Sequence, residues 1–147
     1  KLSEKKRLIL SMDIQKNASK VSIGEASAEE IDSLNIKEAS LLAMERAILG
    51  LNEKNLEVIV DGVDLPKVIF PSQAIIKADE KIPEVMAASI VAKVYRDNLM
   101  VDFSRKFPDF SLEKNKGYPT KKHLNILKLL GPTKYHRMSF KPVLNVR

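Results

Sequence analysis

The stretch that decides the fold runs from Leu56 to Gly62 and reads Leu-Glu-Val-Ile-Val-Asp-Gly. A short, continuous apolar run is typical of a strand that is buried on both faces. Open α/β sheets carry their chemistry just past the carboxyl ends of their strands, so Asp61 occupies a position suited to a catalytic or metal-binding carboxylate. The same residues also suit an Asp-Gly turn in which Asp61 only ends the strand.

A second segment, residues 74–79, repeats this pattern of an apolar strand running into a carboxylate, here Asp79. If the two strands are neighbours and point the same way, Asp61 and Asp79 meet at one edge of the sheet. Carboxylates in a chain with no Cys and two His favour a hard ion such as Mg²⁺ or Mn²⁺. Such ions promote phosphodiester hydrolysis. Two carboxylates are nevertheless few for a two-metal site.

Helical patterns surround these two strands. Ser3 is the expected cap of a helix over residues 4–15, and the capping box at Ser27 starts a short helix. A third helix is expected after Asn35 and ends at Gly50, and a long helix runs from Pro83 to about Lys106. Thr120 starts the last helix, which Gly131 and Pro132 terminate. Pro108 closes the region after the long helix. The alternation of helices with parallel strands predicts an α/β fold.

Three further patterns concern packing. The first helix is expected to turn its apolar residues inward, among them Leu8, Ile9 and Met12. The long helix carries a face of small residues for close packing, formed by Ala87, Ala88, Val91 and Ala92. Residues 20–24 alternate polar and apolar side chains, which is typical of a half-exposed strand.

The composition describes one ordinary domain. The chain has 147 residues, of which 44% are hydrophobic and 30% charged, so it is neither disordered in character nor a membrane protein. No apolar run is long enough to span a bilayer and no signal-peptide pattern opens the chain. We therefore expect a cytoplasmic protein without membrane partners.

The charge is basic and unevenly placed. The formal net charge is +6, from 25 Lys and Arg against 19 Asp and Glu. From Lys114 to Arg147 the chain carries basic residues and no acidic ones. A stretch of this kind suits a phosphate-bearing partner, and the aromatic and glycine residues within it weaken the alternative of a solvated basic tail.

Two segments in this basic part are candidates for nucleic-acid contact. Residues 116–120 place Tyr118 between Lys116 and the start of a helix, where the ring can stack on a sugar or base while the lysine meets phosphate. Residues 136–140 combine Arg137 and Ser139 with an anchoring Phe140, and could hold a phosphate. The alternatives are a core or capping tyrosine for the first segment and a surface turn for the second.

Together with other segments, these residues resemble bacterial ribonuclease HII. The matching stretches, in order along the chain, are KLSEKKR at 1–7, VDG at 60–62 with LP at 65–66, KAD at 77–79, AASIVAKVYRD at 87–97, KGYPT at 116–120, GPT at 131–133 and HRMSF at 136–140. They keep the family's order and approximate spacing and cover essentially the whole chain.

The resemblance implies an RNase H-like mixed sheet flanked by helices. It implies a single domain over 1–147, with an RNase H-like part at 1–110 and a helical, substrate-binding part at 111–147. The implied activity is metal-dependent cutting of RNA in RNA–DNA hybrids and incision at ribonucleotides embedded in DNA, in the context of DNA replication and repair. Of the family's four acidic residues, Asp61 matches the third and Asp79 the fourth, and Mg²⁺ or Mn²⁺ is the expected cofactor.

The resemblance also assigns the substrate side. Tyr118 matches the tyrosine that stacks on the sugar at the RNA-to-DNA junction. Arg137 and Ser139 lie in a segment associated with substrate contact, and Lys116 flanks the tyrosine. Asp97, on the long helix, is interpreted as a helix-surface or structural carboxylate and not as a metal ligand.

The chain departs from the family at its beginning. The family's Asp-Glu pair on a first strand and its Gly-Arg-Gly segment are absent, so we expect the first two strands of the family sheet to be missing. In that sheet they lie between the strand near Val21 and the strand ending at Asp61. An open seam of unpaired backbone groups costs free energy and invites association.

We therefore expect the isolated chain to be unstable or to pair with a missing segment or another chain, and to cleave at or near background. Two rival interpretations remain. One is a non-catalytic nucleic-acid-binding module that needs no metal. The other is a basic α/β scaffold with no salt-dependent affinity for hybrids.

Overall fold

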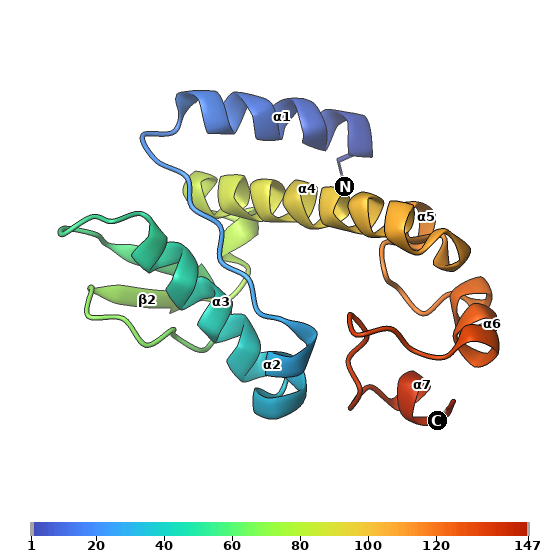
Figure 1. The fold of residues 1–147 in the computed structure, drawn as a ribbon. Coiled ribbons are helices and arrows are strands. Elements are labelled where there is room, and N and C mark those ends of the chain that lie inside the picture. Colours follow the sequence, from blue (N-terminus) through green and yellow to red (C-terminus); the bar gives the residue numbers. More distant parts are fainter. Residues whose placement is uncertain (1, 147) are drawn as a thin grey trace. The chain divides into compact units, whose positions relative to one another are not determined.

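The computed structural model describes residues 2–146 of the chain (Figure 1). In order, the elements are α1 (Glu4–Asn17), α2 (Ala28–Leu34), α3 (Ile36–Gly50), β1 (Val58–Asp61), β2 (Ser72–Ile75), the 3₁₀ helix η1 (Ala78–Glu80), α4 (Pro83–Lys106), the 3₁₀ helix η2 (Pro108–Phe110), α5 (Leu112–Asn115), α6 (Lys121–Leu130) and α7 (Lys141–Leu144). The α/β class is confirmed. None of the helices within the described residues is both long and apolar enough to cross a bilayer.

The described residues form two compact units. The first contains the chain up to Ala26 together with Lys37–Val94, so it holds α1, most of α3, both strands and the first half of α4. The second contains Ser27–Ile36 and the chain from Tyr95 onward, so it holds α2, the second half of α4 and all later helices.

The sheet of the first unit consists of β1 and β2, which run parallel with Val58 opposite Ser72 and Asp61 opposite Ile75. The predicted parallel pairing is confirmed. Val58 and Val60 are buried, whereas Ile59, on the other face, is half-buried. The strand is therefore buried on one face and only partly on the other, because few described groups cover its second face.

The second strand differs from its prediction. It ends at Ile75, and the chain turns at Lys77, whose backbone is left-handed with φ of 56°. Asp79 consequently lies in η1 and not at the end of a strand. The apolar run misled the prediction because Ile76 is 62% exposed and contributes to no strand.

The helix starts follow the predicted caps. The hydroxyl of Ser3 accepts from the backbone N–H of Lys6 at 3.3 Å. Ser27 and Glu30 form a reciprocal capping box, with bonds of 3.1 and 2.8 Å. Thr120 accepts from the N–H of His123 at 3.3 Å and begins α6. Side-chain oxygens thus satisfy backbone donors that have no partner within the helix.

Two packing predictions are wrong. Leu8, Ile9 and Met12 of α1 are 46%, 51% and 64% exposed, so this side of the helix is largely open. On α4, Ala88 and Ala92 are exposed, whereas Val91 is buried. Besides Val91, the residues that α4 buries are Val85, Ile90, Asp97 and Met100.

The segment over residues 20–24 is also not a strand. It runs in extended form and makes no sheet ladder among the described residues, because α3 and the residues after it hold it instead. Lys20 pairs with Glu53 at 2.5 Å and donates to the carbonyl of Leu51 at 3.3 Å. Just beyond the segment, the Arg46 guanidinium donates to the carbonyl of Glu25 at 2.7 Å.

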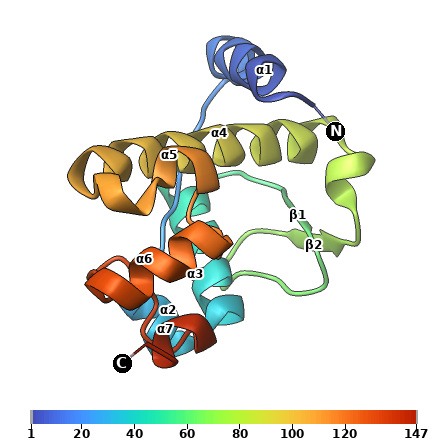
Figure 2. The ribbon, with the colours of Figure 1, turned by 90° about the vertical axis from the view of Figure 1, so that its right-hand side faces the viewer.

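The second unit has its own apolar core. Phe110, Leu112, Leu127 and Val143 are its buried residues, and the partly buried side chains packed on them are Phe103, Phe107, Ile126, Met138, Phe140 and Val146. Figure 2 shows α2 beside the segment that runs from α6 to α7. The short helices α5 and α7 were not predicted, because four residues are too few to show a helical period.

Candidate catalytic carboxylates and substrate-binding segments

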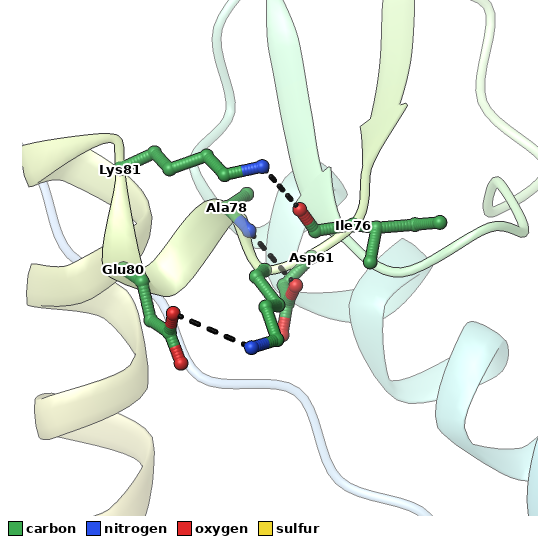
Figure 3. Close-up of polar contacts among 6 residues, drawn as sticks. Asp61, Ile76, Ala78, Glu80 and Lys81 are labelled. Atoms are coloured by element: carbon green, nitrogen blue, oxygen red, sulfur yellow. Dashed lines mark hydrogen bonds and ion pairs between the residues drawn. The ribbon is translucent and has the colours of Figure 1, made fainter.

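Asp61 ends β1 with its side chain exposed. Its Oδ1 accepts a hydrogen bond from the backbone N–H of Ala78 at 3.0 Å, as Figure 3 shows. Ala78 is fully buried and begins η1, so this bond fixes the start of η1 against the end of β1. The half-buried Asp79 is the next residue. The turn therefore places the two predicted carboxylates on adjoining elements.

Two lysines near this edge bond to groups other than the Asp61 carboxylate, as Figure 3 shows. Lys81 donates to the carbonyl of Ile76 at 2.9 Å, and Lys77 lies 3.7 Å from Glu80. Within residues 2–146 there is no group of three or more Asp, Glu, His or Cys side chains that could hold a metal ion. The donor chemistry of Asp61 and Asp79 suits a divalent ion, and the pair fits such an ion only as part of a ligand set.

The segment with Tyr118 begins in a hydrogen-bonded turn. Lys116 and Gly117 both have left-handed backbones, with φ of 50° and 79°. The Asn115 side chain closes the turn, since its Oδ1 accepts from Gly117 N at 2.8 Å and its Nδ2 donates to the carbonyl of Phe110 at 2.6 Å. Tyr118 is 60% exposed, which excludes the core-tyrosine alternative.

The segment with Arg137 and Ser139 is held from α2. Asp32 accepts from the backbone N–H of Met138 at 2.6 Å, and from the N–H and the hydroxyl of Ser139 at 2.9 and 2.5 Å. The Arg137 guanidinium lies over the Phe140 ring, 4.5 Å from its centroid. The Ser139 hydroxyl, more than any other group, lowers the pKa of Asp32. Sequence reasoning missed Asp32, because no local pattern predicts a partner 107 residues away.

A pair of histidines lies between the two segments, and sequence reasoning missed it as well. The Nε2 atoms of His123 and His136 are 3.3 Å apart. His123 Nδ1 lies 3.3 Å from the Asn115 amide, and His136 Nδ1 accepts from the N–H of Thr133 at 3.0 Å. The pair thus connects the turn at Lys116–Thr120 with the segment at Arg137–Ser139.

Acid is expected to destabilise this histidine pair. Burial lowers the pKa of both His123 and His136 from the ordinary value of 6.5. The unfolded chain therefore binds protons at these rings at a higher pH than the folded chain, so stability falls as the pH drops through 6.5 toward the lower folded values. Urea denaturation at pH 7.5 and 5.5 measures the loss. The variant carrying His123→Asn and His136→Asn should lose less stability over this interval, and an unchanged pH slope would contradict the prediction.

Solved structures with the same fold are enzymes of the ribonuclease H type. The ribonuclease H2 of Pyrococcus horikoshii OT3 matches with a TM-score of 0.76 and 23% identity, over 99% of this chain and 77% of that one. The ribonuclease HII of Archaeoglobus fulgidus, solved in a complex with PCNA, matches with a TM-score of 0.76 and 28% identity, over 100% of this chain and 78% of that one. The first of these likenesses concerns the fold alone.

Comparison of the sequence with known proteins identifies the family within the ribonuclease H-type enzymes. The family model described as Ribonuclease HII matches residues 1–143. The ribonuclease HII of Desulforamulus reducens is 46% identical over 97% of this chain and 72% of its own length. That of Natranaerobius thermophilus is 41% identical over 99% of this chain and 73% of its own length. The chain belongs to the ribonuclease HII family, and its enzyme class is that of ribonuclease H-type hydrolases.

Proposed function

We propose that this chain acts in the divalent-metal-dependent cleavage of RNA in RNA–DNA hybrids and in the incision of DNA at embedded ribonucleotides. We assign it to the cytoplasm and to DNA replication and repair. The observation that carries the proposal is the bond from Ala78 N–H to Asp61, which brings η1 and Asp79 to the carboxyl end of β1. Family membership supports the same activity.

In this proposal Asp61 and Asp79 hold the divalent ion, which is Mg²⁺ or Mn²⁺. Once bound, such an ion supplies Lewis-acid activation of water and stabilisation of a leaving oxygen. The contribution of the chain is preorganisation, because the Ala78 N–H fixes one oxygen of Asp61 before any ion arrives. The second oxygen of Asp61 stays available for a ligand.

The substrate is bound by the second unit. Tyr118 stacks on a sugar or base, and its 60% exposure on a closed turn supports this role. Lys116 and Arg137 contact phosphates, and Ser139 belongs to the segment that presents Arg137. We keep the division of a single domain into an RNase H-like part at 1–110 and a substrate-binding part at 111–147 as part of the same proposal.

The family's Asp-Glu pair on a first strand is not among the residues of this chain. We therefore propose that a further segment or another chain supplies it, and that this chain alone cleaves at or near background. The seam would lie beside the extended residues 20–24, which pair with no described strand.

Cleavage of a duplex that carries one embedded ribonucleotide, in Mg²⁺ or Mn²⁺, tests this proposal. The purified chain alone should cut the duplex only at the background rate. Adding strands that bear the Asp-Glu pair should produce cleavage above background, because the carboxylate set is then complete. An all-DNA duplex of the same sequence is the control. Robust cutting by the chain alone would refute the predicted dependence, whereas no cutting after supplementation would refute the activity.

A non-catalytic nucleic-acid-binding module is the second candidate. The observation that favours it is that, within residues 2–146, no group of three or more Asp, Glu, His or Cys side chains could hold a metal ion. Such a module would bind hybrids with a steep salt dependence, since its basic residues displace counterions from phosphates. Binding without any metal-dependent cutting by the supplemented protein would favour this candidate. Affinity that does not change with salt would favour the basic scaffold.

A further inference from the structure

Asp32 on α2 is the acceptor in a three-bond contact with the segment before α7. One oxygen takes the N–H of Met138, and the other takes both the N–H and the hydroxyl of Ser139. These residues are 106 and 107 positions away in sequence and belong to the same unit. Bonds to an ionised carboxylate are about twice as strong as neutral ones, so the contact is well suited to hold two distant segments together.

In the contact with Asp32, both hydrogen-bond donors of Ser139 are occupied. A serine hydroxyl has one proton, and here Ser139 donates it to Asp32. The backbone N–H of Ser139 points to the same carboxylate. Neither donor can serve a phosphate oxygen while the contact is made. With both Ser139 donors occupied, we assign the phosphate contact of this segment to the Arg137 guanidinium.

The contact also fixes the backbone around Arg137. The carbonyl of Arg137 accepts from the N–H of Phe140 at 3.1 Å, which closes a turn over residues 137–140. Phe140 packs against the apolar core, and its ring carries the Arg137 guanidinium at 4.5 Å. Asp32 holds the middle two residues of this turn. The orientation of Arg137 thus depends on bonds made from α2.

We propose that Asp32 is a positioning residue, whose carboxylate holds the turn at residues 137–140 so that Arg137 presents its guanidinium to a nucleic-acid phosphate. The inference rests on the proposed function, in which Arg137 contacts the duplex. It also assigns Ser139 to the support of that contact. The Ser139 hydroxyl lowers the pKa of Asp32, which is consistent with an acceptor that stays ionised in the folded protein.

The first measurement reports on the contact without requiring substrate. In Asp32→Ala, the amide protons of Met138 and Ser139 should exchange with solvent at least about tenfold faster, because bonds to charged groups contribute enough to slow exchange by that factor. Ser33→Ala is the matched control, since the Ser33 hydroxyl bonds only within α2, to the carbonyl of Glu29 at 2.9 Å. It should leave both exchange rates unchanged.

The second measurement is the dissociation constant of the whole chain for an RNA–DNA hybrid, without divalent ions and at fixed salt. Asp32→Ala and Arg137→Ala should each weaken binding roughly tenfold, as expected for the loss of one charge-assisted contact. The double variant should be no weaker than Arg137→Ala alone, because Asp32 acts through Arg137. A purely structural role would instead give additive losses.

If Asp32→Ala does not fold, the same two measurements are made on Asp32→Asn. The amide keeps the shape of the side chain but offers an acceptor on one side only, so intermediate exchange and affinity are expected. Faster exchange with unchanged affinity would overturn the positioning role. Unchanged exchange would overturn the contact itself. If the wild-type chain binds no hybrid, the proposed function fails, and the exchange rates still report separately on the contact.

Discussion

Asp61→Asn is expected to reduce metal-dependent cleavage by roughly 10³-fold or more, with little effect on folding. An asparagine oxygen can still accept from the Ala78 N–H, so the 3.0 Å bond between β1 and η1 survives the substitution. The negative charge that attracts a divalent ion does not. A bound ion supplies several kcal/mol of charge stabilisation, and about 4 kcal/mol corresponds to that 10³-fold change in rate.

The assay for Asp61→Asn uses protein whose wild-type form has first been shown to cut, supplemented with strands that carry the Asp-Glu pair. Asp64→Asn is the matched control. It removes one negative charge from the loop that follows β1, where Asp64 forms an exposed pair with Lys37 at 2.8 Å. Exposed pairs of this kind contribute little to stability, so its cleavage should stay within about twofold of wild type.

Two further readouts separate loss of metal from loss of fold. Calorimetric binding of Mn²⁺ should weaken in Asp61→Asn and stay unchanged in Asp64→Asn. Affinity for the hybrid in the absence of divalent ions should be the same in both variants and in wild type. Normal cutting by Asp61→Asn would show that the carboxylate is not catalytic. Weakened binding of hybrid without metal would indicate a folding defect instead.

Local signals in the sequence were sufficient for the starts of three helices and for the strand that ends at Asp61. Ser3, Ser27 and Thr120 cap their helices as predicted, because a hydroxyl before a helix satisfies free N–H groups whatever surrounds it. The parallel pairing of β1 with the next strand is also as predicted, although the run at 74–79 misplaced the bounds of β2. The caps depend on residues within about four positions of one another, which a sequence displays directly, whereas the strand pairing joins Val58 to Ser72.

Features that depend on distant partners could not be predicted in this way. The exposure of Leu8 and Ile9 is set by which elements cover α1, and the helical pattern contains no information about that. Residues 20–24 alternate like a strand, yet bonds from Lys20 to Leu51 and from Arg46 to Glu25 hold this part of the chain in place of a ladder. The three bonds of Asp32 join segments more than a hundred residues apart. A polar residue inside a short amphipathic helix gives no local sign of such a contact.

The extended segment before α2 contains Gly24, a residue with no room for a side chain. A Cβ on Gly24 would fall on the carbonyl oxygen of Ala43 and lie 2.6 Å from the N–H nitrogen of Ala47. Both atoms belong to the backbone of α3, so no rotamer change can make room. Only glycine allows the segment to approach the helix this closely.

Gly24→Ala is therefore expected to destabilise the protein by roughly 2–4 kcal/mol, from overpacking together with weakened bonds on either side of it. Those bonds join Arg46 to Glu25 and Lys20 to Leu51, and both require the segment to stay against α3. Urea denaturation of the two proteins measures the difference. The expected effect is large because the segment pairs with neither described strand, so its contacts with α3 and the residues after it are what hold it in place.

Gly50→Ala is the matched control for Gly24→Ala, because it adds the same methyl group at a site of similar crowding but different chemistry. Its Cβ would meet the hydroxyl of Ser22, the end of a side chain that can rotate away. Its backbone is not left-handed, and alanine favours a helix more than glycine does. The stability of Gly50→Ala should stay within about 1 kcal/mol of wild type. Equal losses in the two variants would mean that crowding by a fixed helix backbone does not determine the tolerance at Gly24, and that the segment yields from α3 at little cost.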